Sequence, residues 1–161
     1  MPDTQLKQLW ISLLVIGLDQ ITKLIAANQL PLHQPVAVLP YFDWYLTYNT
    51  GAAFSFLADA GGWQRWFFTL TSIIISGIII LWIRKLQPHE HLTAISLCLI
   101  LGGGVGNLID RIYLGHVIDY IQIWLGTYRW PTFNVADAAI SIGVTILIIS
   151  TLVKPQTSVS K

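Results

Sequence analysis

Two aspartates of this chain, Asp119 and Asp137, stand beside long apolar stretches without a neighbouring cation. Neither has a lysine or an arginine within four positions in the sequence. Two uncompensated carboxylates in one site of low dielectric constant are costly unless they share a proton. Carboxyl groups that share a proton can act together as acid and base on a bound water. Asp119 and Asp137 are therefore the first candidates for chemistry in this sequence.

Two other aspartates do have a cation beside them. Asp19 and Lys23 are four residues apart and fall on one face of a helix, so a mutual ion pair is the simple interpretation. Asp110 and Arg111 are adjacent, and adjacent residues do not face each other on a helix. Helix capping and pairing across helices both remain open for the second pair. We expect a structural role for Asp19 and Lys23.

Asparagines and glycines accompany these charged residues. Asn107 and Asn134 lie close to Asp110 and Asp137 in the sequence and could hydrogen-bond between helices. Gly102 and Gly106 form a G-x-x-x-G pattern, which usually indicates close helix packing.

Other chemistries fit the residues less well. The sequence has no H-E-x-x-H, and the histidines (positions 33, 89, 91 and 116) lie outside the apolar stretches, which argues against a zinc peptidase. It also lacks a G-x-S-x-G, which argues against a serine peptidase. The lone Cys98 lies in an apolar run, cannot form an internal disulfide, and is expected to be a packing residue.

The composition indicates which solvent these elements face. The 161 residues suit one domain, which we expect to cover residues 1–161. They are 54% hydrophobic and only 11% charged, whereas soluble domains carry about 25% charged residues. A soluble chain of this size could not bury so much apolar surface, so we expect a membrane protein. The net charge of +1 gives no indication of a nucleic-acid partner.

Four stretches are long and apolar enough to cross a bilayer as helices, at about residues 9–27, 66–83, 92–110 and 133–153. The first is interrupted by Asp19, Gln20 and Lys23. It could be read as a cleaved signal peptide, but Ile25 occupies a position where cleavage requires a small residue. We therefore expect four uncleaved spans.

The lysines and arginines outside these spans predict the orientation. With both termini in the cytoplasm, five lie inside and three outside, and residues 28–64 contain none. In this orientation the polar residues of the first, third and fourth spans all fall near the outer face. Residues 41–49 and 117–125 have strand character. We expect an all-α membrane protein with a small β element on its outer surface, and a polar site beside it.

Five sequence blocks resemble, in order, those of the bacterial lipoprotein signal peptidase (signal peptidase II) family. They are DQITK at 19–23, NTGAAF at 49–54, GGGVGNLIDR at 102–111, VIDY at 117–120 and FNVAD at 133–137. The chain departs from the family at Gly104, where alanine is more common, and at Tyr120, where phenylalanine is more common.

The resemblance implies a function. Members of this family remove the signal peptide from diacylglyceryl-modified prolipoproteins, just before the lipidated cysteine, without a metal or cofactor. It implies a multi-pass protein of the bacterial inner membrane that acts on lipid-bound substrates and is inhibited by the cyclic peptide globomycin. The sequence does not determine the oligomeric state, for which we expect a monomer. Asp119 and Asp137 would be catalytic. The residues expected to support them or to bind substrate are Asn49, Gly51, Asn107, Asp110, Arg111, Asn134 and Ala136.

Two other functions could also place carboxylates among helices. A small transporter would have an inverted repeat, which the sequence lacks, and a site near the middle of the bilayer. A non-catalytic lipid-binding or assembly subunit would tolerate the replacement Asp119→Asn.

Overall fold

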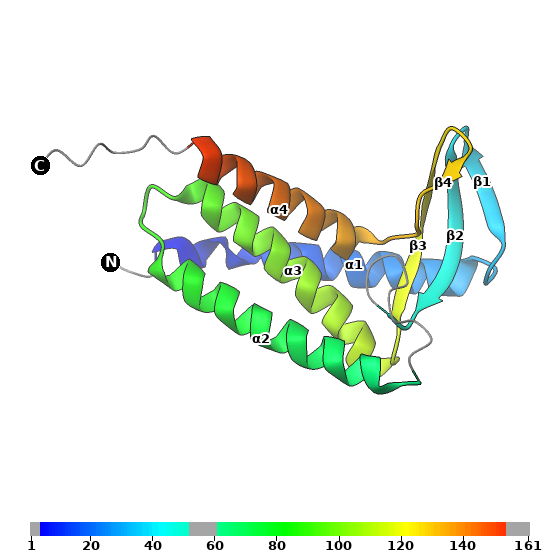
Figure 1. Cartoon of the computed structure of the whole chain (residues 1–161), viewed down its shortest axis with the longest axis horizontal. Coiled ribbons are helices and arrows are strands. Elements are labelled where there is room, and N and C mark those ends of the chain that lie inside the picture. Colours follow the sequence, from blue (N-terminus) through cyan, green and yellow to red (C-terminus); the bar gives the residue numbers. More distant parts are fainter. Residues whose placement is uncertain (1–3, 52–60, 154–161) are drawn as a thin grey trace, which may run out of the picture.

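The computed structural model describes residues 4–51 and 61–153, and it contains a bundle of four long helices with a sheet at one end (Figure 1). A short 3-10 helix, η1 (Thr4–Gln8), leads into α1 (Leu9–Gln29). The other helices are α2 (Trp63–Lys85), α3 (His91–Tyr113) and α4 (Val135–Val153). By length and composition, all four can cross a membrane.

The helices correspond to the predicted spans, with differences at their ends. The first three helices extend beyond the apolar runs by one to three residues, because polar residues at an interface can continue the helical hydrogen bonds. As a result Arg65, which was counted in the outer loop, lies inside α2. By contrast, α4 begins two residues later than predicted, after an asparagine that caps it.

Helix α3 is the centre of the bundle, and its glycines allow the other helices to approach. A Cβ added at Gly102 would lie 2.8 Å from Cβ of Val15 on α1. One added at Gly103 would overlap the carbonyl oxygen of Ala136 on α4. At Gly106 it would lie 2.6 Å from a carboxylate oxygen of Asp19. The packing role predicted for the G-x-x-x-G pattern is confirmed, and Gly103 extends it to a second helix.

The predicted β element is a four-stranded antiparallel sheet in the order β1-β2-β3-β4. The strands are β1 (Pro35–Leu39), β2 (Phe42–Asn49), β3 (Val117–Leu125) and β4 (Tyr128–Arg129). Both predicted strands are confirmed as β2 and β3. The sequence patterns predicted neither the two-residue β4 nor β1, which begins with a proline and lies at the edge of the sheet, where proline is tolerated.

The register between β2 and β3 is interrupted by a bulge. Trp44 pairs with Ile121 and Thr47 pairs with Asp119, so β2 has one more residue than β3 over this interval. Bulges of this kind re-aim side chains and are frequent beside functional sites. Beyond the bulge, Asn49 pairs with Val117 and lies diagonally across from Asp119.

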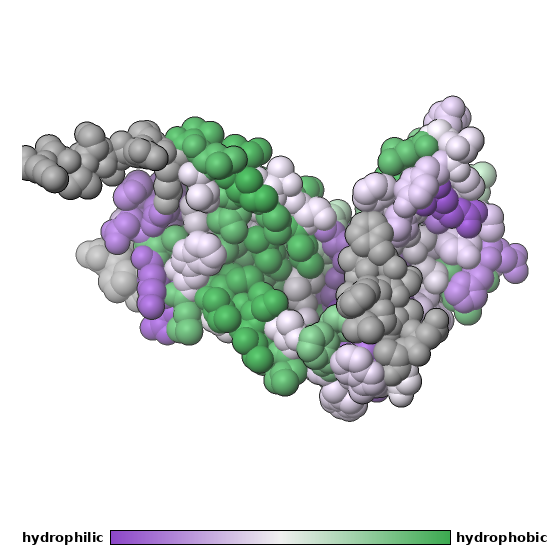
Figure 2. All heavy atoms as spheres, viewed as in Figure 1, coloured by the Kyte–Doolittle hydropathy of each residue, from purple (hydrophilic) through white to green (hydrophobic). Residues whose placement is uncertain are grey.

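The surface of the bundle is apolar. Figure 2 shows hydrophobic residues along the helices and hydrophilic residues at the end away from the sheet and on the sheet itself. Large apolar side chains such as Leu13, Leu24 and Leu152 are 61–78% exposed. Soluble monomers do not expose continuous apolar surface on this scale. The interior holds two apolar clusters, one around Leu97 in the bundle and one around Leu46 under the sheet.

Candidate active site

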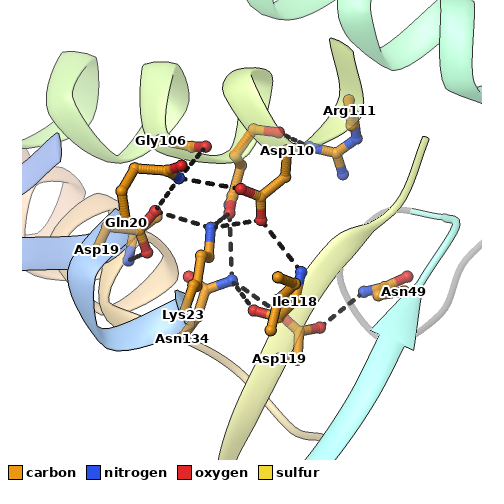
Figure 3. A network of polar contacts seen from close by, with 12 residues as sticks. Asp19, Gln20, Lys23, Asn49, Gly106, Asp110, Arg111, Ile118, Asp119 and Asn134 are labelled. Atoms are coloured by element: carbon orange, nitrogen blue, oxygen red, sulfur yellow. Dashed lines mark hydrogen bonds and ion pairs between the residues drawn. The ribbon is translucent and has the colours of Figure 1, made fainter. Parts of the chain in front are cut away.

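The buried charges on α1 and α3 form one cluster around Lys23. The Nζ of Lys23 lies 2.8 Å from Asp19 Oδ2 and 2.9 Å from Asp110 Oδ2 (Figure 3). Gln20 joins the same two carboxylates through its Nε2, at 3.2 Å and 2.9 Å. We call Asp19, Gln20, Lys23 and Asp110 the Lys23 cluster. The predicted pair of Asp19 with Lys23 is confirmed, and Asp110 pairs across helices rather than with Arg111.

The Lys23 cluster also orients an asparagine. The third hydrogen bond of the Lys23 ammonium goes to Asn107 Oδ1, at 2.9 Å. Since a lysine can only donate, it fixes the amide of Asn107 with its oxygen toward Lys23 and its nitrogen away from it. That nitrogen donates to Asp137 Oδ1 at 2.8 Å. The charged cluster therefore positions Asp137 through one neutral side chain.

The first turn of α4 is closed by a reciprocal cap. Asn134 accepts a hydrogen bond from the backbone N–H of Asp137 at 2.9 Å, and Asp137 accepts one from the N–H of Asn134 at 3.2 Å. This arrangement is the capping box, with asparagine and aspartate in the two positions. Asp137 thus lies at a helix N-terminus, where the helix dipole favours a negative charge.

Asp119, on β3, is held by two amides. Asn134 Nδ2 donates to its Oδ1 at 2.7 Å, and Asn49 Nδ2 donates to its Oδ2 at 3.1 Å. Asn134 therefore bonds directly to both Asp119 and Asp137, and its side chain is fully buried. We call Asp119 and Asp137 the aspartate pair. In the described residues, no lysine or arginine nitrogen lies within 4.0 Å of either carboxylate.

Asp119 is only 2% exposed, and its surroundings disfavour its charged form. Burial raises the pKa of its carboxyl group to about 7, with a further contribution from the nearby charge of Asp137. The hydrogen bonds from Asn49 and Asn134 oppose this rise in pKa without cancelling it. At neutral pH, Asp119 can therefore keep a proton.

Both members of the aspartate pair line one cleft of about 600 Å³. We call it the helix cleft, because α2, α3 and α4 contribute side chains such as Ser72, Gly104 and Ile140. The strands and the segment 130–133 contribute the rest of its wall. Figure 2 shows a notch between α4 and the sheet at this end of the bundle. The cleft is large enough for a ligand of drug-like size, and the two carboxylates are its acidic groups.

Arg111 and Gly51 meet at the rim of the site. Arg111 Nη2 donates to the carbonyl oxygen of Gly51 at 2.9 Å, which ties the end of β2 to α3. Arg65 supports this contact from α2, since its guanidinium donates to the carbonyl oxygens of Arg111 and Ile112 at 2.8 Å and 2.7 Å. Positions 52–54, the rest of the second block, lie outside the described residues.

The structure thus brings the predicted site residues together at one end of the bundle. Ala136 is fully buried, and its backbone N–H donates to Asp19 Oδ1 at 2.9 Å. Sequence reasoning missed the contributions of Gln20 and Arg65. Gln20 is part of the first block, but its bond to Asp110 depends on how α1 and α3 face each other. In the described residues, no three acidic, histidine or cysteine side chains group closely enough to hold a metal ion.

A comparison with sequence models of protein families matches residues 11–153 to signal peptidase (SPase) II. The match covers all four helices and the sheet. The chain belongs to the signal peptidase II family. Membership implies a peptidase, and with the four apolar helices it makes the chain a multi-pass membrane protein.

Curated relatives of this signal peptidase II family member agree with the assignment. The lipoprotein signal peptidase of Pseudomonas putida is 50% identical over 145 residues, which are 89% of this chain and 85% of the relative. That of Pseudomonas aeruginosa strain PAO1 is 47% identical over 153 residues, 91% of this chain and 90% of the relative.

Solved structures carry the same fold. A bacterial membrane enzyme solved in meso at 2.3 Å resolution superposes with a TM-score of 0.85 at 29% identity, covering 96% of this chain and 93% of that one. A second, at 1.9 Å resolution, gives a TM-score of 0.80 at 30% identity, covering 92% and 94%. The superpositions cover more than nine-tenths of this chain, so they include the sheet as well as the bundle.

Proposed function

We propose that this signal peptidase II is an intramembrane aspartyl endopeptidase that removes the signal peptide from diacylglyceryl-modified prolipoproteins, cutting before the lipidated cysteine. The observation that carries the proposal is the aspartate pair. Two buried carboxylates line one cleft, are joined by Asn134, and have no cation within ion-pair distance among the described residues. Paired carboxyl groups that share a proton are the acid–base arrangement of aspartic proteases.

In the proposed reaction, Asp119 holds the shared proton and Asp137 is ionised. Asp137 takes a proton from a water as the water oxygen attacks the scissile carbonyl carbon, and Asp119 gives its proton to the carbonyl oxygen. The intermediate then collapses, with Asp137 protonating the amine that leaves and Asp119 recovering a proton from the hydroxyl group. The pair returns to its starting state, and one water is consumed for each peptide bond.

In this reaction the amides around the aspartate pair hold the two carboxyl groups in place by hydrogen bonds. Asn107 and the Asn134 backbone donate to Asp137, so they stabilise its negative charge without neutralising it. A lysine in their place would form an ion pair and lower the basicity of the carboxylate. Asn49 and Asn134 orient Asp119 in the same way.

The substrate would reach the helix cleft from the bilayer. Relatives are named lipoprotein signal peptidases, and the apolar part of the cleft wall suits acyl chains and a signal helix. We place the chain in the bacterial inner membrane with both termini in the cytoplasm and the site at the outer face. Reporter fusions at Gly61 and after Lys161 should report outside and inside, respectively, and a reversed pattern would overturn this topology.

We also propose that the protein acts as a monomer, that it needs no metal or cofactor, and that globomycin-type peptides bind in the helix cleft.

The decisive experiment uses the purified protein and a preprotein prepared with and without the diacylglyceryl group. The lipidated form should show the mobility shift of signal-peptide removal, and the unlipidated form should not. Cleavage of neither form would exclude the function, and equal cleavage of both would exclude the substrate class.

A further inference from the structure

Asp119 is reached from two sides. Besides the helix cleft, it lines a pocket of about 240 Å³ that lies over the sheet. We call this the sheet pocket. Its walls are mostly polar, and they are formed by β2, β3, β4 and segment 130–132 through residues that include Tyr45, Thr47, Gln122 and Arg129. The two cavities adjoin, since both are lined by Asn49, Asp119 and segment 130–132, but they differ in the chemistry of the rest of their walls.

The sheet pocket contains a buried acceptor without a partner. Gln122, on β3, is only 2% exposed, yet its side-chain oxygen has no hydrogen bond. Buried polar atoms are almost always paired, because leaving one unpaired costs free energy. Gln122 lines the pocket three residues beyond Asp119 on β3, where it pairs with Asp43 of β2. The oxygen has less than 1 Å² of accessible surface, so the Gln122 side chain would have to turn toward the pocket to accept a hydrogen bond from a ligand N–H group, such as that of a peptide backbone.

The wall of the same pocket carries a positive charge, that of Arg129. The Arg129 guanidinium lies over the rings of Trp124 and Tyr45, at 4.8 Å and 5.4 Å from their centroids. Trp124 is itself held by a hydrogen bond to Asp43 at 2.7 Å. In the described part of the chain, no carboxylate oxygen lies within 4.0 Å of Arg129. The side chain is exposed, so its charge can face a ligand.

We propose that the sheet pocket binds the polypeptide segment that follows the scissile bond, with Gln122 bonding its backbone and Arg129 favouring an acidic side chain. The inference rests on the proposed function. A substrate whose signal helix and lipid fill the apolar helix cleft must pass Asp119 at the cut. The polar pocket adjoins Asp119 beyond the helix cleft, so it is placed to receive the segment that follows the cut. Its volume of about 240 Å³ has room for about two residues.

The charge preference can be tested with two lipidated preproteins that differ only in the three residues after the lipidated cysteine, acidic in one and basic in the other. The parent should cleave the acidic one with a kcat/KM about threefold to fivefold higher at low salt, the range of an exposed ion pair. Arg129→Glu should reverse the order. Arg84→Glu, an exposed arginine at the opposite end of α2, is the matched control and should keep the parent's order.

The assay is run in bicelles of zwitterionic lipid, so that no anionic headgroup competes for Arg129. A parent that shows no preference between the two substrates in this lipid would overturn the proposal. An unchanged order in Arg129→Glu would also overturn it.

The role of Gln122 needs a second pair of substrates, a full-length one and one that ends at the lipidated cysteine. Gln122→Leu should raise KM about threefold to tenfold for the full-length substrate, the effect of one hydrogen bond, and leave the short one unchanged. Equal losses on both substrates would mean that the pocket only supplies water or supports the fold. If Gln122→Leu does not fold, the exposed Arg129→Glu variant decides alone.

The two proposals fail in different ways. If the parent cleaves neither lipidated substrate, the peptidase function itself is wrong. If the parent cleaves all of them without preference, and the variants follow it, the function stands and only the assignment of the sheet pocket is wrong.

Discussion

Four aspartates where the helices meet the sheet, Asp19, Asp110, Asp119 and Asp137, are buried or partly buried, but they are held in two different ways. In the Lys23 cluster, Asp19 and Asp110 each lie within 2.9 Å of an ammonium group. In the aspartate pair, Asp119 and Asp137 receive hydrogen bonds from neutral amides and backbone groups. An ion pair keeps a carboxylate charged and inert, whereas neutral donors hold it in place and leave its proton affinity free. The difference separates residues that stabilise the fold from those that can react.

The two regions are connected through the side chain of Asn107, and also through the backbone N–H groups of Ile118 and Ala136, which donate to Asp110 and Asp19. Asn107 accepts from Lys23 and donates to Asp137, so the rigid ion cluster sets the orientation of the reactive carboxylate. This connection explains why the cluster lies next to the cleft rather than elsewhere in the bundle. A catalytic group must be held to within a fraction of an ångström, and neighbours that are themselves fixed achieve this.

The largest effect should come from Asp137→Asn, which keeps the shape of the side chain but cannot take a proton from water. Cleavage of the lipidated preprotein should fall by about 10³-fold or more. The double variant with Asp119→Asn should be no slower than either single variant, because the pair acts as a unit. Single-turnover rates measure this, and substantial cleavage by Asp137→Asn would remove Asp137 from the mechanism.

The next largest effect should come from the other region. Lys23→Ala leaves Asp19 and Asp110 without their shared cation in a buried site. Removing one partner of a buried pair costs about 3–5 kcal/mol, so the variant should unfold at a lower temperature and accumulate less. Lys7→Ala, which removes an exposed lysine from η1, is the control and should melt like the parent. If Lys23→Ala also melts like the parent, the structural role of the cluster is wrong.

Asn134 belongs to both the fold and the aspartate pair, and two substitutions separate these roles. Asn134→Ala removes the cap of α4, at a cost of about 0.5–2 kcal/mol, and the bond to Asp119. Asn134→Ser restores a capping oxygen but not the amide donor. We expect serine to recover thermal stability and to stay about 10-fold to 100-fold slower than the parent. Recovery of full activity with serine would show that Asn134 acts only as a cap.

The smallest effect is a pH dependence. With its pKa raised to about 7, Asp119 loses its proton above neutral pH, and both carboxylates then carry a charge. No acid remains for the carbonyl oxygen, so kcat/KM should decline about tenfold for each pH unit above 7. Stability should also decrease as the pH rises. Asp119 binds its proton more tightly in the folded protein than in the unfolded chain, so its contribution to the free energy of unfolding decreases between about pH 4 and pH 7. A flat rate up to pH 9 would contradict the assignment.

Much of the arrangement could be predicted from the sequence because it depends on local patterns. Uncharged runs of sufficient length predict helices that span a membrane, and the alternation in 41–49 and 117–125 predicts strands. The spacing of Asp19 and Lys23 predicts their ion pair. Among the aspartates in and between the first, third and fourth spans, only Asp119 and Asp137 have no lysine or arginine within four positions, apart from Asp43 and Asp59 of the first outer segment.

The remaining contacts could not be predicted because they depend on how the helices are rotated against one another. Nothing local to Lys23 indicates that Asp110, 87 positions away, shares its ammonium. The bond from Arg65 to the carbonyls at the end of α3 likewise has no signature in the sequence around it. The cap formed by Asn134 was predictable in principle, since asparagine is a favoured N-cap residue and Asp137 follows three positions later.

The most direct test makes the same change in both regions and measures both properties. Asp119→Asn and Asp19→Asn are compared by cleavage per folded molecule and by thermal unfolding. Asp119→Asn should abolish cleavage and keep most of the parent's stability. Asp19→Asn should lower the unfolding temperature more than Asp119→Asn does, because it also takes a carboxylate away from the buried Lys23, and its folded fraction should still cleave. The opposite result, an active Asp119→Asn or a stable but inactive Asp19→Asn, would contradict the division between inert and reactive carboxylates.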